Sequence, residues 1–74
     1  MKKIFLNVDG MKCGMCEAHI NDIVRKTAKI KKVKSSHKKN ETIIIMENDD
    51  NIDSIIEAIK SLGYNCSLNR IEEK

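Results

Sequence analysis

The sequence predicts an α+β domain in which two helices cover one face of a four-stranded antiparallel sheet. Four short segments carry alternating or continuous apolar runs, which are typical of strands. Two longer segments repeat apolar residues every three to four positions, which indicates amphipathic helices. Gly, Asn and Asp fall between several of these segments, as expected of turns. The predicted order is therefore strand, helix, strand, strand, helix, strand.

The first strand and the first helix flank a turn that contains two glycines. In residues 3–9 every second residue is apolar, which predicts a half-buried strand. Residues 10–15 follow as the turn, because Gly10 and Gly14 permit a positive φ or a close approach of the backbone. Residues 16–28 then read as an amphipathic helix. The apolar stripe of this helix consists of Ile20, Ile23, Val24 and Thr27.

The middle of the chain predicts a hairpin. Residues 30–37 are a weakly patterned strand, residues 38–40 a plausible hairpin tip, and residues 41–47 a third strand with a continuous apolar run. We expect three apolar side chains on the face of the sheet away from the helices, where they would form a patch or ordinary surface. These are Phe5, Ile44 and Met46.

The C-terminal third predicts a second helix and a last strand. Residues 52–62 repeat isoleucine at helical spacing, and Asp50 or Asn51 can cap this helix at its N-terminus. Gly63 ends the helix, because glycine tolerates the left-handed conformation common after a helix. Residues 64–70 form the last short strand.

The order βαββαβ with an antiparallel sheet is the ferredoxin-like sandwich. If the strands run alternately up and down, three connections lie at one end of the sheet. They are the 10–15 turn, the 38–40 hairpin tip and the Gly63–Tyr64 turn. We expect the tail, residues 72–74, to fray.

Composition and charge narrow the function classes. The chain has 74 residues, which suffice for one domain, 1–74, without a separate catalytic domain. Its only two aromatic residues, Phe5 and Tyr64, offer no platform for stacking bases, so we expect no nucleic-acid partner. Residues 25–39 hold eight Lys or Arg and no acid, which predicts either a solvated face or a surface that orients a partner. No segment is apolar enough to enter a membrane or to act as a secretory signal.

Two cysteines three residues apart, Cys13 and Cys16, are the chemical centre of the sequence. They fall on the turn into the first helix, where unpaired N–H groups and the helix dipole favour a thiolate. Thiolates bind soft metals and exchange disulfides, and both functions are open to this pair. A closed zinc site needs four ligands, and a thioredoxin-like site usually belongs to a larger fold. An exposed two-coordinate pair suits Cu(I) best among the common metals.

The segment from Val8 to Cys16 resembles the G-M-x-C-x-x-C signature of the heavy-metal-associated domain family, which contains copper chaperones and N-terminal domains of copper-transporting P-type ATPases. The turn Gly63–Asn65 looks like the G-Y-D/N turn of bacterial copper chaperones. Four apolar positions also match the family pattern: Ile20, Val24, Ile43 and Ile45.

The resemblance implies roles for individual residues. Cys13 and Cys16 would be the metal ligands, Met11 would pack under the loop, and Tyr64 would lie near the thiolates. Lys12 departs from the Thr or Ser common at this position. It cannot supply the hard third ligand found in zinc and cadmium exporters, which favours Cu(I).

Four further residues have open roles. Met15 is either an exposed loop residue or a transient third ligand, and His19 is either a solvated histidine or a ligand reaching back along the helix. Tyr64 either approaches a thiolate or covers the core. Cys66 is either a small buried hydrophobe facing the helices or a third thiol ligand.

The expected function is binding and transfer of Cu(I) by a cytoplasmic copper chaperone that is not an enzyme. Its partner would be the metal-binding domain of a copper-transporting P-type ATPase or a similar thiol site. The chain would be a monomer, or a dimer bridged by metal. The alternatives are an ATPase domain, a Hg(II) or Zn(II) carrier on the same fold, and a thiol–disulfide redox protein.

Overall fold

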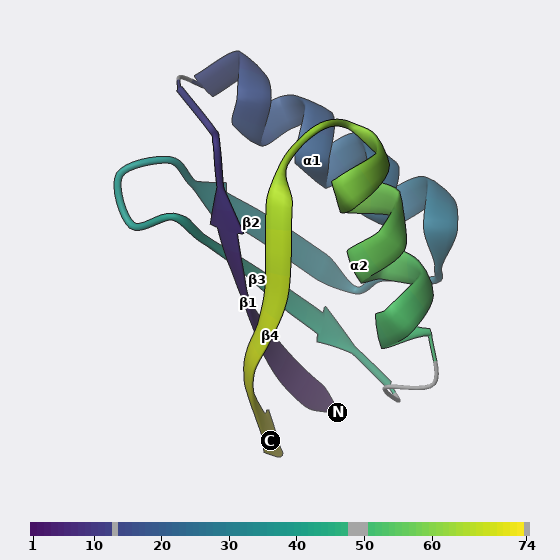
Figure 1. Ribbon diagram of the computed structural model, residues 1–74. Helices are drawn as coiled ribbons and strands as arrows, with labels where there is room; N and C mark the ends of the chain where they lie inside the picture. Colours follow the sequence, from purple (N-terminus) through teal and green to yellow (C-terminus); the bar gives the residue numbers. More distant parts are fainter. Residues whose placement is uncertain (13, 48–50, 74) are drawn as a thin grey trace.

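The computed structural model describes residues 1–12, 14–47 and 51–73 (Figure 1). Its elements follow the predicted order and are β1 (Lys2–Asp9), α1 (Gly14–Thr27), β2 (Lys32–Ser36), β3 (Glu41–Met46), α2 (Ile52–Ser61) and β4 (Asn65–Glu73). Within the described ranges, neither helix has the length and apolar character needed to cross a membrane.

The four strands form one antiparallel sheet in the order β2-β3-β1-β4. Both helices pack on the same face of this sheet, and the opposite face carries no helix (Figure 1). The ferredoxin-like βαββαβ fold is thus confirmed. Strand β1 lies between β3 and β4, so both of its edges are hydrogen-bonded, while β2 and β4 form the two edges of the sheet.

The hydrophobic core lies between the sheet and the two helices. Its central side chains come from β1, β3 and both helices and are almost completely buried: Ile4, Leu6, Val8, Ile20, Val24, Ile44, Ile55 and Ile59. These positions follow the predicted stripes of the helices and the alternation of the first strand. Burial of aliphatic side chains is the main source of stability in a domain of this size.

The face assigned to β3 from the sequence was wrong. Ile44 pairs with Ile4 and is fully buried, and Met46 is also buried, so both residues face the helices. The outward positions are Ile43 and Ile45, which are half-buried. A continuous apolar run has no alternation of its own, so the register with β1 decides which of its side chains point toward the helices.

Phe5 does lie on the face away from the helices, but it is not an exposed apolar residue. Only 5% of it is accessible to solvent. The guanidinium of Arg70 on β4 lies 3.8 Å from the centre of the Phe5 ring, and the amine of Lys3 lies 5.2 Å from it. The aliphatic stems and charged ends of these cations cover the ring and interact with its π face.

The helix ends differ from prediction in detail. Helix α1 begins at Gly14, two residues earlier than expected, which makes Cys16 its third residue. Asn51 occupies the N-cap position of α2, but its side chain makes no capping hydrogen bond. Asp50, the alternative cap, lies outside the described residues. Gly63 follows α2 with a φ of +99° and donates its N–H to the carbonyl of Lys60 at 2.9 Å, as expected of a helix-ending glycine.

Strand β4 is longer than predicted, and the tail was wrongly expected to fray. Glu72 and Glu73 pair with the first residues of β1, while Lys74 lies outside the described part. A shift of register between Phe5 and Leu6 marks a β-bulge in this pairing, because their partners are Arg70 and Leu68.

A buried polar group joins α1 to the sheet. The Ser35 hydroxyl on β2 donates to Oδ1 of Asn21 at 2.7 Å and lies 3.1 Å from the Thr42 hydroxyl on β3. Ser35 and Thr42 are both buried, so the three groups satisfy one another where water has little access. This group fixes α1 above the β2–β3 pair.

The register of β3 can be tested by replacing two adjacent isoleucines. Ile44→Ala should lower the free energy of unfolding by about 2–5 kcal/mol, because it leaves a cavity in the core. The matched control Ile45→Ala should cost about 1 kcal/mol, because this side chain is only half-buried. Urea unfolding measures both, and equal losses would contradict the observed register.

Candidate metal-binding loop

The loop between β1 and α1 starts with a glycine at positive φ and a buried methionine. Gly10 has a φ of +109°, a conformation that favours glycine. Met11 is 7% exposed and belongs to the core, as the resemblance implied. Lys12 is exposed, and Cys13 lies outside the described residues. The buried Met11 side chain therefore anchors the loop to the core immediately before the two cysteines.

The three connections predicted to meet at one end of the sheet do meet there. The N–H of Val8 donates to the carbonyl of Asn40 in the hairpin tip at 2.9 Å. Asp9 pairs with Asn65 of β4, next to the Gly63–Tyr64 turn. Both contacts lie at the end of β1 that leads into the cysteine loop (Figure 1).

Tyr64 packs directly on the start of the loop. A Cβ added to Gly10 would lie 3.1 Å from Cδ1 of the Tyr64 ring, so there is almost no room for a side chain at this position. The tyrosine is half-buried against the core. It therefore covers the core and contacts the cysteine loop at the same time.

Cys16 occupies the first turn of α1. Its side chain is half-buried and packs against the core cluster. In the first turn of a helix the backbone N–H groups lack helical partners and the dipole is positive, which stabilises an anionic sulfur. The thiolate is the form of cysteine that binds soft metals.

Glu17, the next residue of α1, links this turn to the hairpin. Its Oε2 accepts the backbone N–H of His37 at 2.7 Å and lies 2.6 Å from Nδ1 of the same residue. These hydrogen bonds, the backbone one first, lower the pKa of the Glu17 carboxyl below its ordinary value of 4.5. His37 is therefore held by Glu17. The sequence shows that Glu17 lies near the start of the helix, but no pattern in it indicated that His37 would be its partner.

The other candidate ligands are distributed around the helix. Met15 is in the first turn of α1 and 70% exposed. His19 is exposed and lines a shallow groove on α1 with Asp22, Lys26 and Leu62. Among the residues that the structure describes, which leave out Cys13, no three His, Cys, Asp or Glu side chains are grouped as a metal site.

Cys66 is part of the core. It pairs with Val8 across the β1–β4 ladder and is 6% exposed. Burial raises the pKa of its thiol to about 11, so the neutral form is favoured. This agrees with the interpretation of Cys66 as a small buried hydrophobe.

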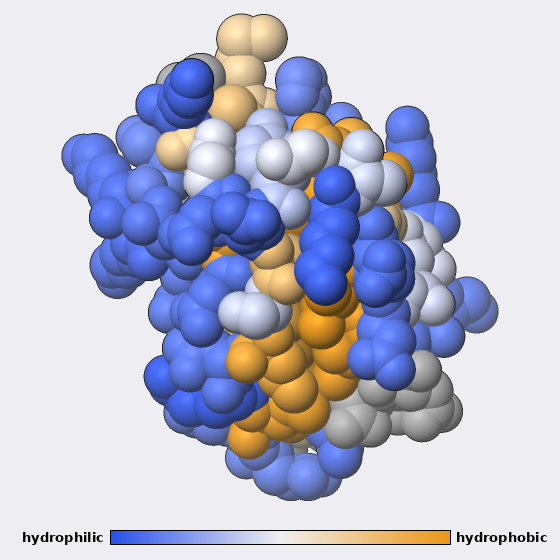
Figure 2. All heavy atoms as spheres, viewed as in Figure 1, coloured by the Kyte–Doolittle hydropathy of each residue, from blue (hydrophilic) through white to orange (hydrophobic). Residues whose placement is uncertain are grey.

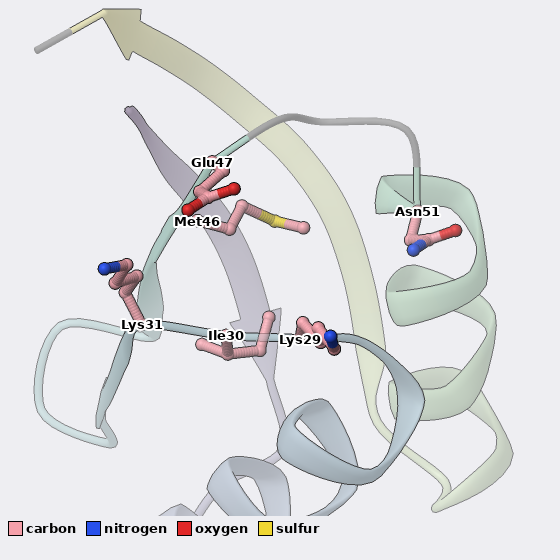
Figure 3. Close-up of a pocket in the computed structure, with 6 residues that line it drawn as sticks. All are labelled: Lys29, Ile30, Lys31, Met46, Glu47 and Asn51. Carbon is pink, nitrogen blue, oxygen red and sulfur yellow. The ribbon is translucent and has the colours of Figure 1, made fainter.

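A larger hollow lies at the opposite end of the sheet, with a volume of about 570 Å³ (Figure 3). It is lined by residues of the α1–β2 connection, the end of β3 and the start of α2: Lys29, Ile30, Lys31, Met46, Glu47 and Asn51. In Figure 3 the thioether of Met46 extends toward α2. Its described lining contains no cysteine, so the hollow is separate from the cysteine loop.

The contact between Gly10 and Tyr64 can be tested with two glycine substitutions. Gly10→Ala and Gly63→Ala both place a side chain at positive φ, which costs about 1–2 kcal/mol. Gly63 has open space around its added Cβ, whereas Gly10 faces the tyrosine ring. We therefore expect Gly10→Ala to cause the larger loss of stability in urea unfolding. An equal or larger loss in Gly63→Ala would contradict this packing.

The Glu17–His37 contact predicts a pH dependence of stability. Because the pKa of Glu17 is lowered on folding, the contact stabilises the protein above pH 4.5 and this contribution disappears as the pH falls through the folded-state pKa. The metal-free wild type should thus unfold less readily than Glu17→Gln at pH 7, and the difference should vanish in acid. Glu57→Gln, an exposed position on α2, is the control and should show no such pH-dependent difference.

Comparisons with known proteins identify the family of this fold and loop. Residues 5–65 match the model of the heavy-metal-associated domain. The chain is 32% identical over 73 residues to mercuric reductase of Lysinibacillus sphaericus, a match that covers 99% of this chain and 13% of that protein. The chain therefore spans only a small part of that relative.

Two solved structures extend this likeness to three dimensions. The yeast copper transporter domain Ccc2a has 31% identity and a TM-score of 0.85, with 95% of this chain and 97% of that chain covered. The copper chaperone of Enterococcus hirae in its apo form has 30% identity and a TM-score of 0.78, with 89% and 98% covered. The match of most of the chain to the family model shows that it belongs to the heavy-metal-associated domain family.

Proposed function

We propose that the chain binds Cu(I) as its cargo between the thiolates of Cys13 and Cys16 and transfers it to another protein. The observation that carries this proposal is the position of Cys16. It lies in the first turn of α1, directly after a loop anchored by the buried Met11, in a member of a heavy-metal-binding family. The proposal assigns the second ligand, Cys13, from its place three residues earlier in the sequence.

The donor set and its surroundings suit a soft monovalent ion. Two thiolates are sufficient for Cu(I), which accepts low coordination numbers and prefers sulfur. A Cu(I) bis-thiolate carries a net negative charge, and the exposed Lys12 beside the loop offsets part of it. The likeness to a copper transporter domain and a copper chaperone, each at 30% identity or more, supports copper among the soft metals.

Transfer would take place by exchange of thiolates. A sulfur of the partner adds to the two-coordinate ion before one of the original sulfurs leaves, so the ion never passes free through water. The partner we propose is the metal-binding domain of a copper-transporting P-type ATPase or a similar thiol site. Lys38 and Lys39 are exposed in the hairpin at the loop end of the sheet and would attract an acidic partner surface.

The remaining properties follow from this role. Residues 1–74 would act as one metal-binding unit, without catalysis. A reducing compartment such as the cytoplasm would keep the thiols available for metal. Tyr64, packed on Gly10, would shield the loop from solvent and slow the loss or oxidation of the ion.

A mercury carrier is the second candidate, because the chain is 32% identical to a mercuric reductase over 73 residues. Two thiolates also suit Hg(II), so the site itself does not distinguish the two ions. Zn(II) would seek further ligands beyond the two sulfurs.

The proposal predicts that Cu(I) binding depends on two of the three cysteines. Under anaerobic conditions and against a competing chelator, the protein should bind one Cu(I) more tightly than about 1 μM. The double variant Cys13→Ser, Cys16→Ser should weaken binding by more than the 10- to 100-fold typical for loss of a residue that only supports a ligand. The matched control Cys66→Ala should keep the wild-type affinity, because this thiol is buried in the core.

Parallel titrations with Hg(II) and Zn(II) decide between the metals. Weak Cu(I) binding, or binding that survives loss of both loop cysteines, would refute the proposal. Reduction of insulin disulfides that persists in the presence of a chelator would instead support a thiol–disulfide redox protein.

A further inference from the structure

The sheet face that carries no helix has a distinct surface chemistry. We call the part of this face away from the cysteine loop the outer sheet face. Its residues point away from the helices and come from the middle and far end of the strands: Lys3, Phe5, Lys32, Lys34, Ile43, Ile45, Arg70 and Glu72. The register brings these residues together, since Ile45 lies between Lys3 and Lys32 and Ile43 lies between Phe5 and Lys34. Four cations thus surround three apolar side chains across all four strands.

The cations on this face are largely uncompensated. Arg70 is paired with Glu72 on the same strand, with Nε and Oε2 2.9 Å apart. Within the described ranges, no ion pair involves Lys3, Lys32 or Lys34. Lys3 lies opposite Glu72 in the β1–β4 ladder, and two further outward carboxylates, those of Glu41 and Asp9, lie nearer the cysteine loop. Within the outer sheet face as defined, four cations stand beside one carboxylate, so positive charge predominates in this part of the sheet.

The outer sheet face carries charged side chains but no highly exposed large apolar side chain, and it lines neither of the hollows described above. The large apolar side chains with most exposure are at other places: Met1, Met15, Leu62, Leu68 and Ile71. Figure 2 shows an apolar strip in the region where Figure 1 places β4 and α2. Neither of the hollows described above is lined by a residue of the outer sheet face. Protein partners usually need buried aromatic or aliphatic anchors, whereas a flat cationic surface suits diffuse negative charge.

Stacking with nucleic-acid bases is disfavoured by the state of Phe5. Sheets that bind single strands expose aromatic rings for the bases to stack on. Here the single aromatic ring of the face is 5% exposed and already covered by Arg70. The outer sheet face thus has cations like those of nucleic-acid-binding surfaces, but its aromatic ring is not exposed for bases to stack on.

We propose that the outer sheet face docks on the anionic surface of a lipid bilayer. The lysines lie over the headgroups, and the half-buried Ile43 and Ile45 remain above the hydrocarbon, so the contact is electrostatic and reversible. The cysteine loop lies at the end of the sheet, next to this face rather than within it. A docked molecule therefore keeps the loop accessible along the plane of the membrane.

The test measures binding of the metal-free, reduced protein to vesicles of phosphatidylcholine with 40% phosphatidylglycerol, by co-sedimentation at low salt. We expect binding to these vesicles, none to pure phosphatidylcholine, and loss on raising the salt. Each lysine near an anionic surface contributes about fivefold in affinity, so Lys32→Gln with Lys34→Gln should weaken binding about 25-fold. The matched double variant Arg25→Gln, Lys26→Gln removes the same charge from exposed positions on α1 and should bind within about threefold of wild type.

Three outcomes would overturn the proposal. They are absence of binding to the anionic vesicles, equal losses in the two double variants, and tighter binding of a single-stranded oligonucleotide that depends on the same lysines. Since the protein is metal-free throughout, the result does not depend on the proposed copper function. Circular dichroism of each variant verifies that the exposed substitutions leave the fold intact.

Discussion

The structure depends on the pairing of β1 with both of its neighbours. Strand β1 is hydrogen-bonded to β3 on one side and β4 on the other, and its inward side chains form the centre of the core. Its C-terminal end leads directly to Gly10 and Met11. The cysteine loop consequently begins directly after a strand whose backbone is hydrogen-bonded on both sides. Because the loop is short, this constraint also limits where Cys16 can lie.

Helix α1 is attached to the sheet in two different ways along its length. Ile20 and Val24 pack on the core, while Glu17 and Asn21 make hydrogen bonds to residues of the β2–β3 hairpin. Hydrogen bonds are directional, so they constrain the rotation of the helix more strongly than apolar packing does. The turn that holds Cys16 is therefore fixed by polar contacts on one side and by the buried Met11 on the other. For the metal site proposed above, such constraint would lower the reorganisation needed when two sulfurs close on an ion.

The sequence predicted the architecture well because most of its elements follow one clear period. Helical spacing defined the buried stripes, and alternation defined the first strand. The prediction was wrong where the period was absent, as in β3, where Ile44 faces the helices because of its pairing with Ile4. It was also wrong for the tail, since pairing of Glu72 and Glu73 depends on β1 and not on local propensity.

The candidate site was predicted in the same uneven way. The spacing of the cysteines is read directly from the sequence, and the convergence of three connections follows from the topology. The burial of Met11 was implied by the family resemblance. The Glu17–His37 contact could not, because the two residues are 20 positions apart and follow no motif. The cover of Phe5 by Arg70 likewise depends on a bulge that no local pattern indicates.

The bulge in β4 affects whether two copies of this chain can associate through the edges of their sheets. Open strands at the margins of a sheet invite edge-to-edge polymerisation, which leads to fibrils. One margin here is β2, whose Lys32 and Lys34 repel a second copy, and the other is β4, whose regular ladder is interrupted opposite Phe5 and Leu6. Both margins thus resist uncontrolled stacking at the high local concentrations of a crowded cell.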